Sequence, residues 1–128
     1  MPNPISIVVI DNHQAFRTTI REILRSQSGF VVVAEASDGL EAWSLIQEQI
    51  PEVALIDVEM PGLDGLTLLG RLRDANLAVA GIVLTFHKDL GTLNLALDIG
   101  ARGFLLKEAV AIELIPCLLT VAEGKLYV

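Results

Sequence analysis

The chain has 128 residues, of which 52% are hydrophobic, and its formal net charge is −7. This length is that of one domain with a substantial core. The acidic balance argues against direct contact with nucleic acid, because phosphate backbones are bound through clustered Lys and Arg. Charged residues interrupt every apolar run, so no stretch reaches the roughly 20 residues of a membrane span.

The single cysteine, Cys117, lies in an apolar stretch with helical spacing. One cysteine excludes an internal disulfide bond and fits a reducing compartment. We therefore expect a cytoplasmic location, with Cys117 as a buried thiol of the core.

Five short apolar runs alternate with five segments of helical periodicity. The expected strands are 5–10, 30–34, 53–56, 81–85 and 103–106. The first expected helix carries an apolar stripe over 16–24 and stops near Gly29. The other expected helices span about 38–50, 66–74, 90–99 and 110–123. This alternation predicts an α/β fold with a mostly parallel sheet covered on both faces. Right-handed crossovers leave few topologies, and the doubly wound, flavodoxin-like order 2-1-3-4-5 is the most economical.

Polar side chains stand at the carboxyl ends of four of these strands: Asp11 and Asn12, Asp57, Thr85, and Lys107. In the expected order the first and third strands are neighbours, so Asp11 and Asp57 should converge. Two carboxylates and an amide oxygen suit Mg²⁺. A hydroxyl and an ammonium group supply a donor and a positive charge for a phosphoryl group. Asp57 is then the best-placed nucleophile for forming an aspartyl phosphate.

The motif Asp57-x-x-Met60-Pro61-x-x-Asp64-Gly65, together with Thr85 and the segment Gly103-Phe104-Leu105-Leu106-Lys107, resembles the receiver domain of two-component response regulators. The likeness covers residues 5–124 and implies a CheY-like (βα)5 fold. It implies that Asp57 accepts phosphate from a sensor histidine kinase or a phosphotransfer protein. It also implies that the chain is not an enzyme and at most catalyses its own phosphorylation and dephosphorylation. Thr85 and Lys107 would bind the phosphoryl group.

The same resemblance implies further roles. Asp11, Asn12 and Asp57 would hold Mg²⁺ with the backbone carbonyl of Glu59. Phe104 matches the aromatic residue whose rotamer follows Thr85 when phosphate arrives. The runs 34–39 and 122–124 resemble receivers that precede a LuxR/NarL-type helix-turn-helix. We therefore expect residues 1–128 to be one receiver domain cut from a longer transcriptional regulator with a C-terminal output domain.

Two residues depart from the family pattern. Asn12 replaces a second acid, which predicts weaker Mg²⁺ binding and slower phosphorylation. Phe86, directly after Thr85, replaces a smaller residue and narrows the pocket rim, where His87 also lies. Neither His13 nor His87 has the spacing of zinc ligands.

The fourth and fifth helices look too apolar for simple surface helices. Leu90, Leu93 and Leu97 form the expected core stripe of 90–99, and Leu95 and Ile99 fall outside it. A helix that is apolar around most of its circumference usually buries a second face. With the fifth strand, these helices are expected to form a surface for a homodimer or an output domain.

Other interpretations remain open. A degenerate receiver would use the same fold for binding without phosphorylation, and Asn12 and Phe86 favour it. A flavodoxin-like FMN protein needs a phosphate-cradling loop after the first strand, where this chain has Asp11-Asn12-His13. Phosphatases with an aspartyl nucleophile carry it on the first strand, whereas Asp57 follows the third. A purely structural domain does not account for four polar strand ends.

Overall fold

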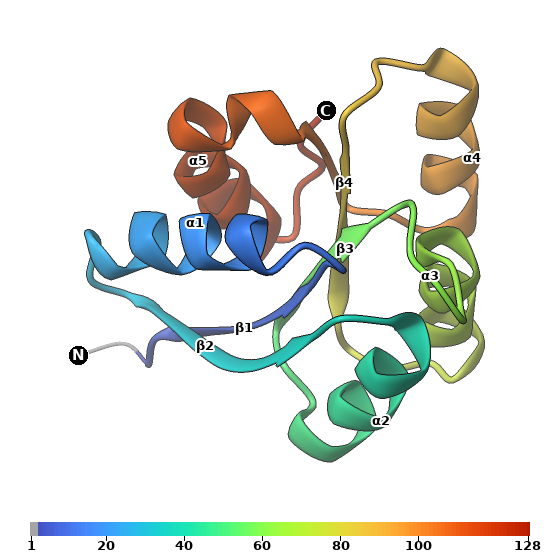
Figure 1. Cartoon of the computed structure of the whole chain (residues 1–128), viewed down its shortest axis with the longest axis horizontal. Coiled ribbons are helices and arrows are strands. Elements are labelled where there is room, and N and C mark those ends of the chain that lie inside the picture. The colour runs from blue at the N-terminus through green and yellow to red at the C-terminus, as the bar shows by residue number, and fades with distance from the viewer. Residues whose placement is uncertain (1–2) are drawn as a thin grey trace.

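The computed structural model describes residues 3–128 as a five-stranded parallel sheet between two layers of helices (Figure 1). The strands are β1 (Ile5–Ile10), β2 (Phe30–Ala36), β3 (Val53–Asp57), β4 (Ala80–Thr85) and β5 (Gly103–Leu106). The helices are α1 (Gln14–Arg25), α2 (Gly39–Gln49), α3 (Gly65–Asp74), α4 (Leu90–Ile99) and α5 (Val110–Ala122). A 3₁₀ turn, η1 (Lys107–Ala109), joins β5 to α5. The sheet order β2-β1-β3-β4-β5 confirms the predicted topology.

The alternation of side chains along the strands builds two cores, one on each face of the sheet. Ile7 and Val9 of β1 belong to the cluster under α1 and α5, whereas Val8 and Ile10 belong to the cluster under α2, α3 and α4. All four side chains are completely buried. Because successive residues of a strand point to opposite faces, a strand covered on both sides must be apolar throughout.

Aspartates begin three of the helices. The Asp38 carboxylate accepts a hydrogen bond from the Glu41 amide at 2.8 Å, and Asp64 accepts from the Thr67 amide at 2.9 Å. Asp89 plays the same part for α4. These bonds satisfy amide groups that have no partner within the helix. Helix α1 lacks such a cap, because His13 precedes it and turns its ring toward Asp11.

Two expectations from the sequence need correction. Strand β2 continues to Ala36 instead of ending at Ala34, because its parallel pairing with β1 continues to Ala36 after a register shift between Ile7 and Val8. The expected core stripe of α4 is wrong at its start, since Leu90 is 70% exposed and the buried residue of this helix is Ala96. The small Ala96 side chain belongs to the α2–α3–α4 cluster, and α4 packs chiefly against α3.

The last described residues return to the open edge of the sheet. Tyr127 bridges to Gly103 in parallel, its amide donates to the carbonyl of Arg102, and its carbonyl accepts from Phe104, both at 3.0 Å. The Tyr127 hydroxyl donates to Glu113 of α5 at 2.8 Å. Among residues 3–128, none of the helices combines the length and apolarity required to cross a membrane.

Candidate functional site

Four polar or charged side chains are buried among residues 3–128, and they meet at the carboxyl edge of the sheet. Asp11 follows β1, Asp57 ends β3, Thr85 ends β4 and Lys107 follows β5. Each is exposed by 5% or less. Burial of polar groups is unfavourable unless they find partners. The predicted convergence of the strand ends is therefore confirmed, and the sequence had named all four residues.

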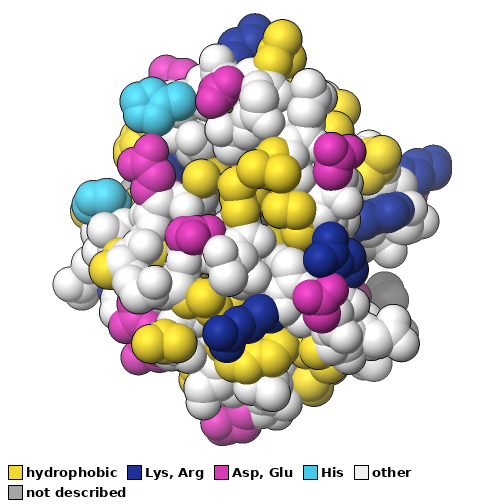
Figure 2. All heavy atoms as spheres, turned by 90° about the vertical axis from the view of Figure 1, so that its right-hand side faces the viewer, with side chains coloured by type: hydrophobic (Ala, Val, Ile, Leu, Met, Phe, Trp, Pro, Cys, Tyr) yellow, Lys and Arg dark blue, Asp and Glu magenta, His cyan; other side chains and the backbone are white. Residues whose placement is uncertain are grey.

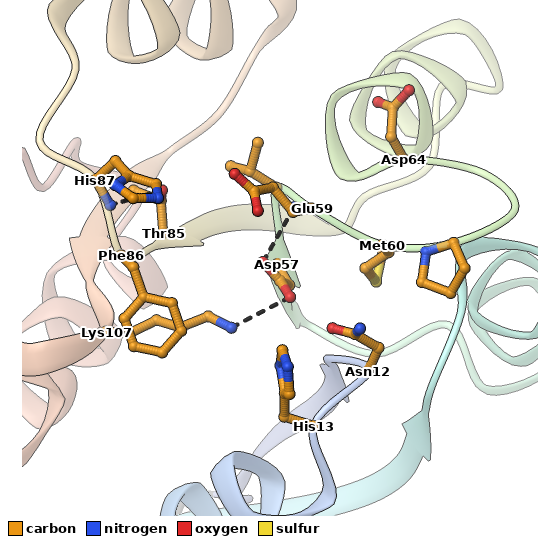
Figure 3. Close-up of a pocket in the computed structure, with 12 residues that line it drawn as sticks. Asn12, His13, Asp57, Glu59, Met60, Asp64, Thr85, Phe86, His87 and Lys107 are labelled. Atoms are coloured by element: carbon orange, nitrogen blue, oxygen red, sulfur yellow. Dashed lines mark hydrogen bonds and ion pairs between the residues drawn. The ribbon is translucent and has the colours of Figure 1, made fainter.

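Lys107 connects the two carboxylates. Its Nζ lies 2.5 Å from Oδ2 of Asp11. It also lies 3.2 Å from Oδ2 of Asp57, the contact that Figure 3 shows as a dashed line. The other oxygen of Asp11 accepts a hydrogen bond from the His13 amide at 2.8 Å. The single positive charge of Lys107 neutralises one of the two negative charges of Asp11 and Asp57, so a net charge of −1 remains among these three side chains.

The environment of Asp57 raises the pKa of its carboxyl above the ordinary value. The largest cause is burial, which disfavours the charged form, and the negative charge of Asp11 adds to it. The Glu59 amide, which donates to Oδ1 of Asp57 at 3.1 Å, and the Lys107 ammonium act in the opposite direction. A further positive charge nearby would therefore stabilise the ionised form of the buried Asp57 carboxyl.

The loop after β3 holds Asp57 at the pocket floor. The Val58 amide donates to the Leu84 carbonyl at 3.0 Å, and the Gly65 amide donates to the Val58 carbonyl at 3.2 Å. A Cβ at Gly65 would lie 2.2 Å from the carbonyl oxygen of Asp57. Only glycine permits this close approach of α3 to the end of β3. The Asp64-Gly65 pair of the sequence motif therefore has a packing reason.

A cavity of about 440 Å³ opens above Asp57, and most of the predicted residues line it. Its wall contains Asn12, Glu59, Thr85, Phe86, His87 and Lys107. The Thr85 hydroxyl accepts a hydrogen bond from the His87 amide at 3.1 Å, so it is engaged within its own loop. Phe104 does not line this cavity. It is half-buried beside a second cavity of about 280 Å³ near the start of α4.

The donor set at the cavity fits a divalent cation. Oxygen atoms of Asp11 and Asp57 and a ring nitrogen of His13 all lie within 4.8 Å of one another. Figure 3 shows Asn12 and His13 extending toward Asp57 from the loop after β1. Carboxylate and amide oxygens are the ligands that Mg²⁺ uses together with water. The sequence did not predict a metal-binding role for His13, because its spacing is not that of zinc ligands. The one feature of the sequence that could have indicated the role is its position two residues after Asp11, an acid at the end of a strand.

Sequence reasoning missed two residues that brace this site. Nη1 of Arg17 donates to the backbone carbonyl of Asp11 at 2.5 Å, and Nε of Arg17 pairs with Glu35 at 3.2 Å. Arg17 therefore ties the end of β1 to β2. The ring of Phe16 contacts Lys107, with its centroid 4.7 Å from Nζ. Both residues lie on the first turn of α1, directly after the Asp11 loop, and that nearness was the only signal in the sequence.

The fold and the four buried strand-end residues are those of a receiver domain, and the family comparison agrees. Residues 7–118 match the response regulator receiver domain, and the chain belongs to that family. Its relatives are response regulators of the LuxR/NarL type. The transcriptional regulatory protein DegU of Brevibacillus brevis is 38% identical over 126 residues, which are 98% of this chain and 53% of that protein. The probable transcriptional regulatory protein NarL of Mycobacterium tuberculosis is 35% identical over 97% of this chain and 57% of its own length.

Solved structures give the same answer. The signal receiver domain of the putative response regulator NarL from M. tuberculosis superposes with a TM-score of 0.93 and 35% identity, covering 97% of this chain and 100% of that one. The isolated receiver domain of RcsB from Salmonella enterica, solved with phosphomimetic BeF₃⁻, has a TM-score of 0.88 and 26% identity over 96% and 91% of the two chains. The present chain spans slightly more than half the length of the DegU and NarL relatives, 53% and 57%.

Proposed function

We propose that this domain accepts a phosphoryl group on Asp57 from a sensor histidine kinase or a phosphotransfer protein, with Mg²⁺ as cofactor. One observation carries the proposal. The buried carboxylate of Asp57 faces a cavity of about 440 Å³ and has the Lys107 ammonium 3.2 Å from its Oδ2. A carboxylate nucleophile beside a fixed cation is the arrangement that phosphoryl transfer needs.

In the proposed reaction a carboxylate oxygen of Asp57 forms the new bond to phosphorus. The P–N bond of the donor phosphohistidine breaks, its electron pair returns to the imidazole nitrogen, and that nitrogen takes a proton from water. Lys107 neutralises charge on the phosphoryl oxygens, and the Thr85 hydroxyl, at the cavity wall, donates to one of them. Attack by water on the aspartyl phosphate later releases inorganic phosphate.

The residues that would hold Mg²⁺ are Asp11, Asn12, Asp57 and the backbone carbonyl of Glu59. The bound ion supplies positive charge that offsets the negative charge of the phosphoryl group during transfer. Asn12 contributes an amide oxygen without a formal charge. The proposal therefore includes a metal site weaker than one with a second aspartate at this position.

The proposed output is a change of surface around α4, β5 and α5, reached from the pocket through Thr85 and Phe104. Leu95 of α4 and Ile112 and Leu119 of α5 are exposed by 50%, 82% and 50%. Figure 2, which faces the α3 and α4 side of the molecule and not α5, shows further apolar side chains gathered on that side. Exposed apolar patches of this kind mark contacts with other molecules. A second copy of the chain or an output domain would cover this surface, in a cytoplasmic regulator of transcription.

The phosphoacceptor role is tested by mass spectrometry of the protein treated with acetyl phosphate and Mg²⁺. The wild type should gain the mass of one phosphoryl group, and Asp57→Asn should gain none. Asp64→Asn is a matched control, because Asp64 also lines the cavity but is exposed and caps α3. A wild type that stays unmodified at saturating Mg²⁺ would contradict the proposal.

The second candidate is a degenerate receiver that binds a partner without phosphorylation. Asn12 is the observation that favours it, since the amide removes one charge from the metal site. Such a domain would not be modified under the conditions above, yet it would keep its partner surface. Sedimentation velocity of the wild type and of Leu95→Glu, with and without acetyl phosphate, reports whether that surface joins two copies and whether phosphate controls it.

A further inference from the structure

The ammonium group of Lys107 lies between two aromatic rings. Nζ is 4.7 Å from the ring centroid of Phe16, on α1, and 4.8 Å from the ring centroid of Phe86, directly after β4. Both separations fall within the about 6 Å over which an aromatic face attracts a cation. The carboxylates of Asp11 and Asp57 take the ammonium on its remaining sides. Lys107 is therefore held by four groups from four different segments.

The two rings differ in exposure. Phe16 is half-buried, whereas Phe86 is 58% exposed and lines the mouth of the cavity. The side chain of Lys107 is nevertheless only 1% exposed. Figure 3 shows the Phe86 ring lying across the Lys107 side chain. Phe86 thus stands between the ammonium and the solvent, which accounts for an exposed phenylalanine at a polar rim.

We propose that Phe86 is a positioning residue that clamps the Lys107 ammonium against Phe16 and keeps it at Asp57. This inference rests on the proposed function, because Lys107 serves the phosphoryl group there. In the resting domain the clamp fixes the cation that Asp57 needs. In the phosphorylated domain it keeps Lys107 on the phosphoryl oxygens and keeps water away from that side of the aspartyl phosphate.

The clamp depends on the aromatic face of residue 86 and not on bulk alone. Phe86→Tyr keeps a ring of the same shape, Phe86→Leu keeps an apolar side chain without a ring, and Phe86→Ala removes both. Because Phe86 is exposed, these substitutions leave the core packing intact, and a thermal melt of each variant verifies folding. The three variants therefore separate attraction by the ring from simple steric cover.

The first measurement uses the metal-free, unphosphorylated protein. The ¹H–¹⁵N signal of the Lys107 ammonium should show slow proton exchange with water in the wild type and in Phe86→Tyr. Exchange should be faster by about three- to tenfold in Phe86→Leu and Phe86→Ala, the range expected for loss of one such contact. Equal exchange in all four proteins would overturn the clamp.

The second measurement is the lifetime of the aspartyl phosphate after acetyl phosphate is removed. Phe86→Leu and Phe86→Ala should both shorten it by about three- to tenfold, and Phe86→Tyr should keep the wild-type lifetime. A wild-type lifetime in Phe86→Leu would show that bulk is sufficient and would overturn the clamp. The exchange measurement needs no phosphate, so its failure contradicts the clamp alone, whereas absence of phosphorylation contradicts the proposed function.

Discussion

Lys107 lies closer to Asp11 than to the proposed phosphoacceptor. Its Nζ is 2.5 Å from Oδ2 of Asp11, and the two side chains are exposed by 1% and 0%. The contact joins the ends of β1 and β5, which are not neighbours in the sheet. An ion pair at this depth needs both partners, since removal of one leaves an uncompensated buried charge. The resting pocket is therefore held together by the same cation that the phosphoryl group would use.

Replacement of Lys107 by methionine should destabilise the domain by about 3–5 kcal/mol at neutral pH. Lys107 lowers the pKa of Asp57, so its loss raises that pKa further. The native state then binds a proton more readily than the unfolded chain, so stability should recover when the pH is lowered from neutral to a mildly acidic value, through the raised pKa of Asp57. Urea denaturation at the two pH values measures this, with exposed Lys88→Met as control. A loss that does not change with pH would contradict the explanation.

Replacement of Asp57 by asparagine should have the opposite effect on stability. Because burial and Asp11 raise the pKa of Asp57, its contribution favours the folded state at low pH and is lost as the pH rises through the raised value. The neutral amide removes this penalty and should stabilise the domain by about 0.5–2 kcal/mol at neutral pH. The gain should shrink on acidification, when the wild-type carboxyl is itself neutral. Thermal melts across the acidic range measure it, and a less stable variant at neutral pH would refute the prediction.

The two glycines of α3 should respond in opposite ways to alanine. Gly65→Ala places a Cβ 2.2 Å from the Asp57 carbonyl oxygen, so the backbone must shift, and we expect a loss of about 2 kcal/mol or more. At Gly70 the nearest atom is 3.8 Å away, and alanine should stabilise the helix by about 0.5–1 kcal/mol. Denaturation of both variants tests this. Only Gly65→Ala should also slow phosphorylation, because it alone moves the Asp57 loop.

Much of the fold and of the pocket was predictable from the residues. The strands are apolar throughout, so they show no alternation of buried and exposed residues. Their short length, between segments of helical periodicity, nevertheless predicted five parallel strands. The sheet order then follows from the right-handedness of the crossover connections. The position of Asp57 at a strand end was then enough to bring it to the pocket. The end of β2 was missed because Glu35, an acid in an apolar strand, is stabilised by Arg17 from α1.

Side-chain contacts between distant segments were not predictable. The spacing of Leu90, Leu93 and Leu97 resembles a core stripe, yet α4 buries Ala96, because the approach of the helix to the sheet depends on its neighbours. Phe86 was predicted at the rim from its place after Thr85, but its contact with Lys107 depends on rotamers and on strand order together. The return of Tyr127 to β5 likewise depends on an open sheet edge.

Asn12 is the residue whose replacement should most improve metal binding. It lines the cavity beside Asp57 and carries no charge, while Lys107 already neutralises one of the two acids. Asn12→Asp adds a charge next to the cation, which should strengthen Mg²⁺ binding by about 1–2 kcal/mol, or about five- to thirtyfold. Isothermal titration with Mg²⁺ measures the affinity. Gln14→Glu is the control, because it adds the same charge at an exposed position of α1 that does not line the cavity. If both variants bind Mg²⁺ as the wild type does, the missing charge at Asn12 does not limit metal binding. The prediction that Asn12 slows phosphorylation would then be wrong.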